Sequence, residues 1–210
     1  LLRFVVVDQS KNPVADVELE LVIDHGSAAR GSIEAETAAM GQTDTDGVFV
    51  FSDVPSFERY VVIARHESHA TLHRGGLQLA SGEGRELVLQ LAPGRTVRGV
   101  VADAGGRPIP GAVLTAYDTS HMVLDEERRI ERRAVTDSEG RYALAAIARG
   151  FKNIVATADG HADGVYSSID FSRGKQERAL DFKLARGGNI SGRVLSDRGD
   201  PVSGAIVSIQ

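Results

Sequence analysis

Apolar and polar residues alternate along several short stretches of the chain, which is the pattern of half-buried β-strands. Between residues 17 and 23 one set of alternate positions is wholly apolar, namely Val17, Leu19, Leu21 and Ile23, and the residues between them are Glu18, Glu20 and Val22. The same spacing recurs at Phe49 and Phe51, Leu87 to Leu91, Tyr142 and Leu144, and Leu180 to Leu184. Turns rich in Gly, Asn, Asp and Pro separate these stretches. The pattern therefore predicts an all-β chain of short strands.

The chain repeats itself with a period of about 93 residues. Pro13, Pro108 and Pro201 stand in similar surroundings, 95 and 93 residues apart. The sequence Thr-Asp-Thr-Asp-Gly at 43–47 returns as Thr-Asp-Ser-Glu-Gly at 136–140. Two further pairs of blocks keep the same order: those around His69 and His161, and those at Leu87 to Leu91 and Leu180 to Leu184. Four blocks in one order at nearly one spacing indicate a duplicated unit.

The repeat divides the chain into units 1–94 and 95–187, followed by the start of a third, truncated copy at 188–210. A unit of about ninety residues with many short strands predicts a β-sandwich. Short linkers between the units favour an end-to-end arrangement. Since an isolated hairpin is marginal in water, we expect the native protein to continue after the third copy begins. The best helix candidate is 124–133, although the repeat register favours a hairpin arm there.

The repeated blocks carry a family resemblance that covers the whole chain. In the second unit they read Gly-x-Pro-x-x-Gly-Ala at 106–112, Thr-Asp-x-Glu-Gly-x-Tyr at 136–142 and Gly-His-Ala at 160–162. They resemble carboxypeptidase regulatory-like domains, which are transthyretin-like (immunoglobulin-like) β-sandwiches used as tandem modules. His69 and His161 depart from the Tyr or Phe that is common in the family, and Asp16 from its usual Gly. The resemblance implies a non-catalytic extracellular or cell-envelope module that spaces, docks or weakly binds.

Composition and charge exclude or disfavour several kinds of site and partner. The absence of cysteine removes disulfides and thiolate metal sites, and no apolar run is long enough to span a membrane. A net charge of −5 gives no electrostatic support for a nucleic-acid partner. The first unit is acidic and the second slightly basic, so an attraction between units that salt would screen is a hypothesis. The mixed charged run 125–133 is interpreted as a solvated face.

Histidines supply the densest group of potential ligands, at His66, His69 and His73. The first two are one residue short of the zincin spacing, and a zinc site needs three or four converging ligands. We expect His69 and His161 to pack in the aromatic position of the repeat and His66 and His73 to be solvated, so no metal ligand is assigned. Asp44 to Gly47 is interpreted as a β-turn and not a calcium loop, and Arg198-Gly199-Asp200 as a hairpin tip and not a recognition motif.

Signatures of hydrolytic enzymes are missing, namely Gly-x-Ser-x-Gly and His-x-x-Glu. Lysines suited to the isopeptide crosslinks of some surface adhesins are also expected to be missing, since Lys11 lies in a turn and Lys152 has no obvious strand partner. We therefore assign no catalytic residue and no cofactor, and expect no enzyme activity.

The sequence favours a structural or protein-interaction array of a larger secreted or cell-envelope protein, whose partner is a protein or a neighbouring module of the same chain. One alternative is a carbohydrate-binding module that holds a polysaccharide. The chain has no Trp for such a surface, and Tyr60, Tyr117 and Tyr166 are the candidate exposed rings. A second alternative is an accessory domain of a peptidase or outer-membrane transporter that lies outside this segment.

Overall fold

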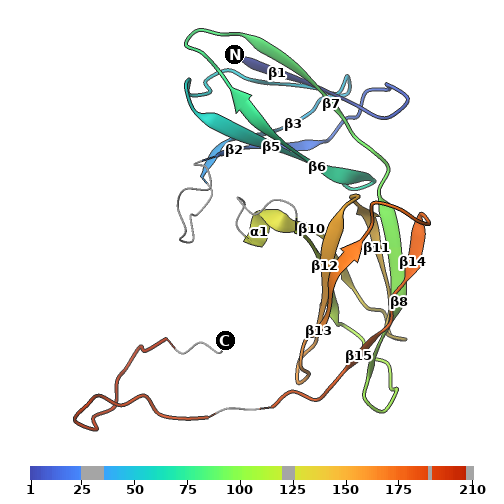
Figure 1. Ribbon diagram of the computed structural model, residues 1–210, viewed down its shortest axis with the longest axis vertical. Coiled ribbons are helices and arrows are strands. Elements are labelled where there is room, and N and C mark those ends of the chain that lie inside the picture. Colours follow the sequence, from blue (N-terminus) through green and yellow to red (C-terminus); the bar gives the residue numbers. More distant parts are fainter. Residues whose placement is uncertain (25–35, 120–125, 189–190, 207–210) are drawn as a thin grey trace.

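The computed structural model describes residues 1–24, 36–119, 126–188 and 191–206, apart from the side chains of residues 126 and 127. Within this part of the chain the fold is all-β, with strands β1 to β7 in one sandwich and β8 to β15 in the next (Figure 1). The first sandwich lies across one end of the second, and the described part of the tail after residue 190 runs away from both (Figure 1).

Two sheets make up the first sandwich. One has the order β4-β1-β7 and the other β3-β2-β5-β6. The strands are β1 (Leu2–Val7), β2 (Glu18–Ile23), β3 (Thr37–Gln42), β4 (Val48–Phe51), β5 (Arg59–His66), β6 (His69–Gln78) and β7 (Arg85–Gln90). The central strand β1 pairs antiparallel with β4 and parallel with β7.

The second sandwich repeats this order, with β11-β8-β14 in one sheet and β10-β9-β12-β13 in the other; β15 also pairs with β8. Its elements are β8 (Arg95–Asp103), β9 (Val113–Asp118), α1 (Glu126–Arg129), β10 (Ile130–Val135), β11 (Arg141–Ile147), β12 (Phe151–Thr157), β13 (Gly164–Asp170), β14 (Glu177–Ala179) and β15 (Phe182–Leu184). The three repeat prolines also occupy matching places, because Pro13, Pro108 and Pro201 form equivalent bridges to the preceding strand or segment.

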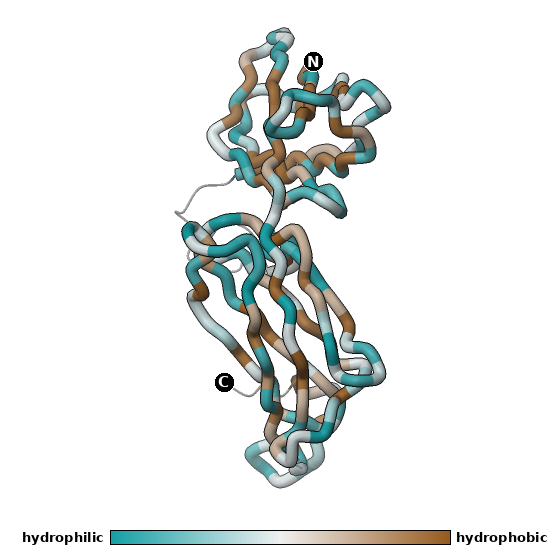
Figure 2. Tube along the Cα trace, turned by 90° about the vertical axis from the view of Figure 1, so that its right-hand side faces the viewer, coloured by the Kyte–Doolittle hydropathy of each residue, from teal (hydrophilic) through white to brown (hydrophobic). Residues whose placement is uncertain are grey.

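Each sandwich has its own apolar core. One contains Phe4, Leu19 and Leu89, and the other Leu114, Leu144 and Phe182. The predicted alternation places the apolar rows inward. Hydrophobic and hydrophilic positions alternate in colour along the strands (Figure 2). Phe49, which the alternation also predicts to face inward, is only half-buried at the edge of the first core, whereas Phe51 is 5% exposed.

The helix candidate at 124–133 is divided between two elements. A single turn, α1, covers 126–129, and β10 begins at Ile130, so the hairpin arm favoured by the repeat register is present from there on. Residues 124 and 125 lie outside the described part. None of the helical structure in the described residues has the length and apolar character that a membrane crossing requires.

Replacing Phe182 by Ala is expected to lower the free energy of unfolding by about 3–5 kcal/mol, because the ring is 4% exposed and contacts Tyr166 at 4.9 Å between centroids. Denaturant titration of the full chain measures the change. The matched control is Val165→Ala, whose side chain is 55% exposed and which should change stability by less than about 0.5 kcal/mol. Equal midpoints for the two variants would contradict the assigned core.

Candidate functional site

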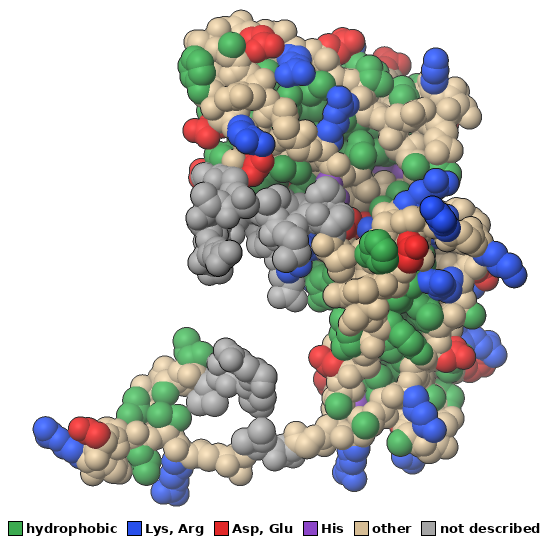
Figure 3. Space-filling view, in the orientation of Figure 1, with side chains coloured by type: hydrophobic (Ala, Val, Ile, Leu, Met, Phe, Trp, Pro, Cys, Tyr) green, Lys and Arg blue, Asp and Glu red, His purple; other side chains and the backbone are tan. Residues whose placement is uncertain are grey.

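Polar side chains gather where the two sandwiches meet. The face of the sheet β3-β2-β5-β6 that points away from the first core lies against the end of the second sandwich where α1, β10 and β12 begin (Figure 1). In the space-filling view, histidine atoms are visible in this seam (Figure 3). We call this region the joint; it includes Glu20, Arg65, Thr71 and His73 of the first sandwich and Asp118, Arg128, Arg132 and Lys152 of the second. It is the part of the described structure in which charged groups are most deeply buried.

Glu20 receives two arginines at the joint, one from each sandwich. Its carboxylate oxygens are 3.0 Å from Arg65 Nη1 and 2.7 Å from Arg128 Nε, and the Thr37 hydroxyl donates to it at 2.8 Å. Burial raises the pKa of Glu20, but these three hydrogen bonds and the charge of Arg128 outweigh burial and leave its pKa below the ordinary value. The carboxylate therefore stays ionised and links the two sandwiches.

Arg132 makes a second link. Its guanidinium donates to the Thr71 hydroxyl at 3.0 Å and to the main-chain oxygens of His66, at 2.8 Å, and of His69. These two oxygens belong to the tip of the β5–β6 hairpin, where His66 and His69 pair. A planar guanidinium with several donors suits such a set of oxygens, so the hairpin tip is held to β10.

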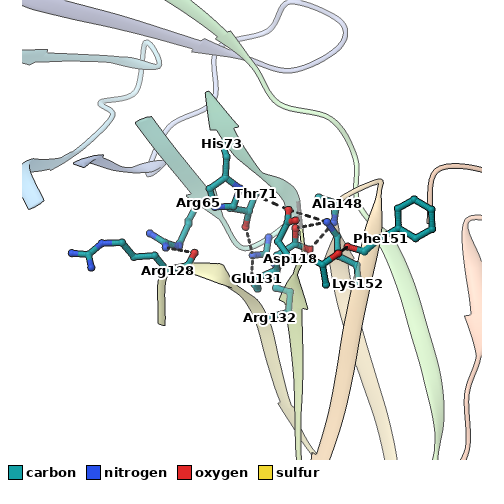
Figure 4. Close-up of polar contacts among 11 residues, drawn as sticks. Arg65, Thr71, His73, Asp118, Arg128, Glu131, Arg132, Ala148, Phe151 and Lys152 are labelled. Carbon is teal, nitrogen blue, oxygen red and sulfur yellow. Dashed lines mark hydrogen bonds and ion pairs between the residues drawn. The ribbon is translucent and has the colours of Figure 1, made fainter. Parts of the chain in front are cut away.

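Four titratable side chains form a buried cluster at the same end of the second sandwich (Figure 4). Lys152 Nζ lies 3.0 Å from Asp118 Oδ2 and 3.0 Å from Glu131 Oε1. The Lys152 and Glu131 side chains are fully buried, and that of Asp118 is 5% exposed. Glu131 also accepts a hydrogen bond at 3.1 Å from the Ala148 amide. His73, from the first sandwich, places Nδ1 4.0 Å from Asp118 Oδ2.

Burial raises the pKa of Glu131 to about 7, although the neighbouring Lys152 acts in the opposite direction. The carboxyl group is thus poised to gain or lose a proton near neutral pH. An amine, a carboxylate and a carboxyl of this kind, in contact and away from water, can exchange protons among themselves.

The histidines are distributed differently from the expectation. His66 and His69 do meet, with 3.0 Å between their Nδ1 atoms. His73 lies apart from them, and its expected exposure to solvent is wrong, because its side chain is 2% exposed against Asp118. His66 ends β5 and is half-buried, not solvated. His69 and His161 are half-buried, and each bridges to the segment that leaves its sandwich.

No three potential metal ligands converge within the residues that the structure describes. The Asp44 to Gly47 segment is a turn, as predicted: the Asp44 carboxylate accepts from the amides of Asp46 and Val48, and Gly47 adopts a φ of 71°. Gly199 likewise has a φ of 87°, and the Ser196 hydroxyl accepts from the amides on either side of it. Both motifs are therefore accounted for by turn geometry.

The interpretation of 125–133 as a solvated face is wrong for Arg128, Glu131 and Arg132. A register shift between Ile130 and Arg132 places Glu131 inward, where the residue is 4% exposed. Asp125 and the side chains of residues 126 and 127 lie outside the described part. One signal was present in the sequence: Lys152 falls on the same alternating positions as Ile154 and Ala156, which are core residues.

Residues 96–185 match the family model of the carboxypeptidase regulatory-like domain. No curated protein matches the chain. Among solved structures, a streptococcal ancillary pilin is 18% identical over 90% of this chain, with a TM-score of 0.40, and the chain spans 62% of its length. The shaft pilin SpaA of Lactobacillus rhamnosus GG is 11% identical over 90% of this chain and 98% of its own, with a TM-score of 0.33. A minor pilin of Streptococcus agalactiae is 11% identical over 92% and 100%, with a TM-score of 0.38.

Because its pKa is higher in the folded chain than the ordinary 4.5, Glu131 stabilises the fold below about pH 4.5, and this contribution is lost as the pH rises to about 7. The loss amounts to roughly 3 kcal/mol. We expect the free energy of unfolding of the wild type, relative to Glu131→Gln, to fall across this interval. Urea titrations at pH 4.5 and 7 test it, with the exposed Glu139→Gln as the control. A difference that rises with pH would contradict the assignment.

Proposed function

We propose that this chain is a non-catalytic structural segment of a larger secreted or cell-envelope protein. In this proposal residues 1–94 and 95–187 are two β-sandwich units, and 188–210 begin a third copy. The observation that carries it is the joint: its arginines and acids bind one another across the two sandwiches, as Glu20 and Arg128 do at 2.7 Å. Such pairing fixes an orientation between units, which is what a spacer or docking array needs.

The connection between the sandwiches supports a stiff joint. Ala70 of β6 donates to the Ala92 oxygen at 2.9 Å, and His69 bridges to Pro93. Gly94 packs so tightly that an added Cβ would lie 2.2 Å from backbone atoms of Ala146. The Arg95 guanidinium then donates to the oxygens of Gly174 and Lys175, at 2.9 and 2.6 Å. The linker is thus bonded on both sides and has little freedom to swing.

The carbohydrate alternative is weakened by the three tyrosines on which it depends. Tyr60 is fully buried, and its hydroxyl donates to the Pro55 oxygen. Tyr117 is half-buried. Tyr166 is 40% exposed, but its hydroxyl donates to the Asp181 oxygen and its ring packs on Phe182. Flat exposed rings are what a sugar-binding surface would need, so a protein partner or a neighbouring unit is the preferred partner.

The double variant Arg128→Ala/Arg132→Ala is expected to release the two units from each other, because it removes the side-chain hydrogen bonds that Glu20, Thr37, Thr71 and the β5–β6 hairpin receive from the second sandwich. Amide ¹⁵N relaxation of the full chain should give one rotational correlation time for both units in the wild type and two clearly different times in the variant. The control is Arg98→Ala/Arg141→Ala, whose side chains are 59% and 68% exposed.

Separate correlation times in the wild type would refute the stiff spacer. A single time in the Arg128→Ala/Arg132→Ala variant would show that the linker alone holds the units, and would refute the role assigned to the joint.

A further inference from the structure

We propose that Lys152 and Asp118 become joined by an isopeptide bond inside the second sandwich, with Glu131 moving the protons. The bond would be an intramolecular modification that the chain carries out on itself. It lies within residues 95–187 and stands independently of the proposed spacer function.

The strand register places the two reacting groups against each other. Lys152 of β12 and Asp118 of β9 are direct partners in adjacent antiparallel strands, where side chains on one face stand about 5 Å apart at Cβ. The Lys152 ammonium donates a hydrogen bond of 3.0 Å to Asp118 Oδ2. This contact brings Nζ close to the Asp118 Cγ, within the range from which bonds form without rearrangement of the fold. The expectation that Lys152 lacks a strand partner is therefore wrong.

Burial of the charged pair favours its condensation to a neutral amide. A buried ammonium–carboxylate pair carries a desolvation penalty that the attraction between the charges only partly offsets. Condensation replaces both charges by a neutral amide and so removes the penalty. Holding the groups in contact supplies the high effective concentration that condensation in water lacks.

The step balances without a redox partner. Proton transfer first gives the neutral Lys152 amine and the Asp118 carboxylic acid. Nζ then attacks Cγ, and the new C–N bond forms as Nζ passes a proton to the Glu131 carboxylate. Glu131 returns that proton to the departing hydroxyl of Asp118, the C–O bond breaks, and one water leaves. The products are the amide and a regenerated Glu131.

Glu131 is better placed to move protons than to become the acyl partner. Its Oε1 is 3.0 Å from Lys152 Nζ, which is the atom that must lose protons. Its Oε2 is held by the Ala148 amide at 3.1 Å, and a pKa of about 7 lets it accept and donate near neutral pH. His73 covers Asp118 from the first sandwich, with 2% of its side chain exposed, and so shields the site from solvent.

The first sandwich offers an internal comparison. At the equivalent place Ile23 of β2 pairs with Tyr60 of β5, and neither side chain can form an amide. We therefore expect a single bond per chain, in the second sandwich.

Intact mass spectrometry of the purified full chain tests the proposal. The wild type should weigh about 18 Da less than its sequence, the mass of one water. Asp118→Ala and Lys152→Met should each show the full mass of their sequence, and Glu131→Gln should show most of the chain unmodified. Asp118→Asn should lose about 17 Da, as ammonia replaces water in the leaving step. Lys183→Met, in β15, is the control and should keep the deficit of about 18 Da.

A tryptic digest of the wild type locates the bond without any variant. Trypsin does not cleave between Arg107 and Pro108, so Asp118 lies in peptide 99–128. The proposal predicts this peptide joined to 150–173, uncleaved after Lys152. A wild-type chain of full mass, or a link from Lys152 to the Glu131 peptide 130–132, would overturn it. Either result leaves the relaxation test of the joint unchanged, so the two proposals fail separately.

Discussion

Charge buried between the two sandwiches is the constraint on which the rest of this structure depends. Taking an ion out of water costs several kcal/mol unless an opposite charge and hydrogen bonds replace the solvent. At the joint each buried acid meets a base: Glu20 meets Arg65 and Arg128, and Asp118 meets Lys152. The orientation of the sandwiches follows from this pairing, because a different orientation would separate Glu20 from Arg128. The two large apolar cores each lie within their own sandwich, and a smaller buried apolar cluster of Val22, Val61 and Ile63 lies in β2 and β5.

The two sandwiches fill the same structural position in different ways. In the first, Tyr60 is fully buried, and its hydroxyl donates to the Pro55 oxygen. In the second, the same strand end holds Lys152 and Asp118, whose charges require each other and are covered by His73 from the first sandwich. The two sandwiches thus share a strand order and differ at this strand end.

Much of the fold could be predicted from the sequence, because strands and turns depend on patterns among residues that are close together in the chain. Alternation identified the inward rows, and turn residues such as Gly47 marked the hairpins. The joint could not be predicted in the same way. Glu131 faces inward because of a register shift in β10, which places neighbouring charged residues in different surroundings. Its partner Lys152 comes from another strand, and His73 from the other sandwich. Lys152 was nevertheless visible as a lone charge in step with core residues of β12, a pattern that indicates a buried partner.

A covalent bond between Lys152 and Asp118 would lie at the end of the second sandwich that contacts the first sandwich. The two residues are 34 positions apart. In the chain-entropy account of crosslinks, closing a loop of that length lowers the entropy of the unfolded chain and so stabilises the fold by about 4 kcal/mol. The bond would hold β9 to β12 where β10 presents Arg132 to the β5–β6 hairpin. Fraying of that end would separate Arg132 and Arg128 from their acceptors before the apolar core opened. A tie there therefore protects the contacts between sandwiches as well as the sheet in which it forms.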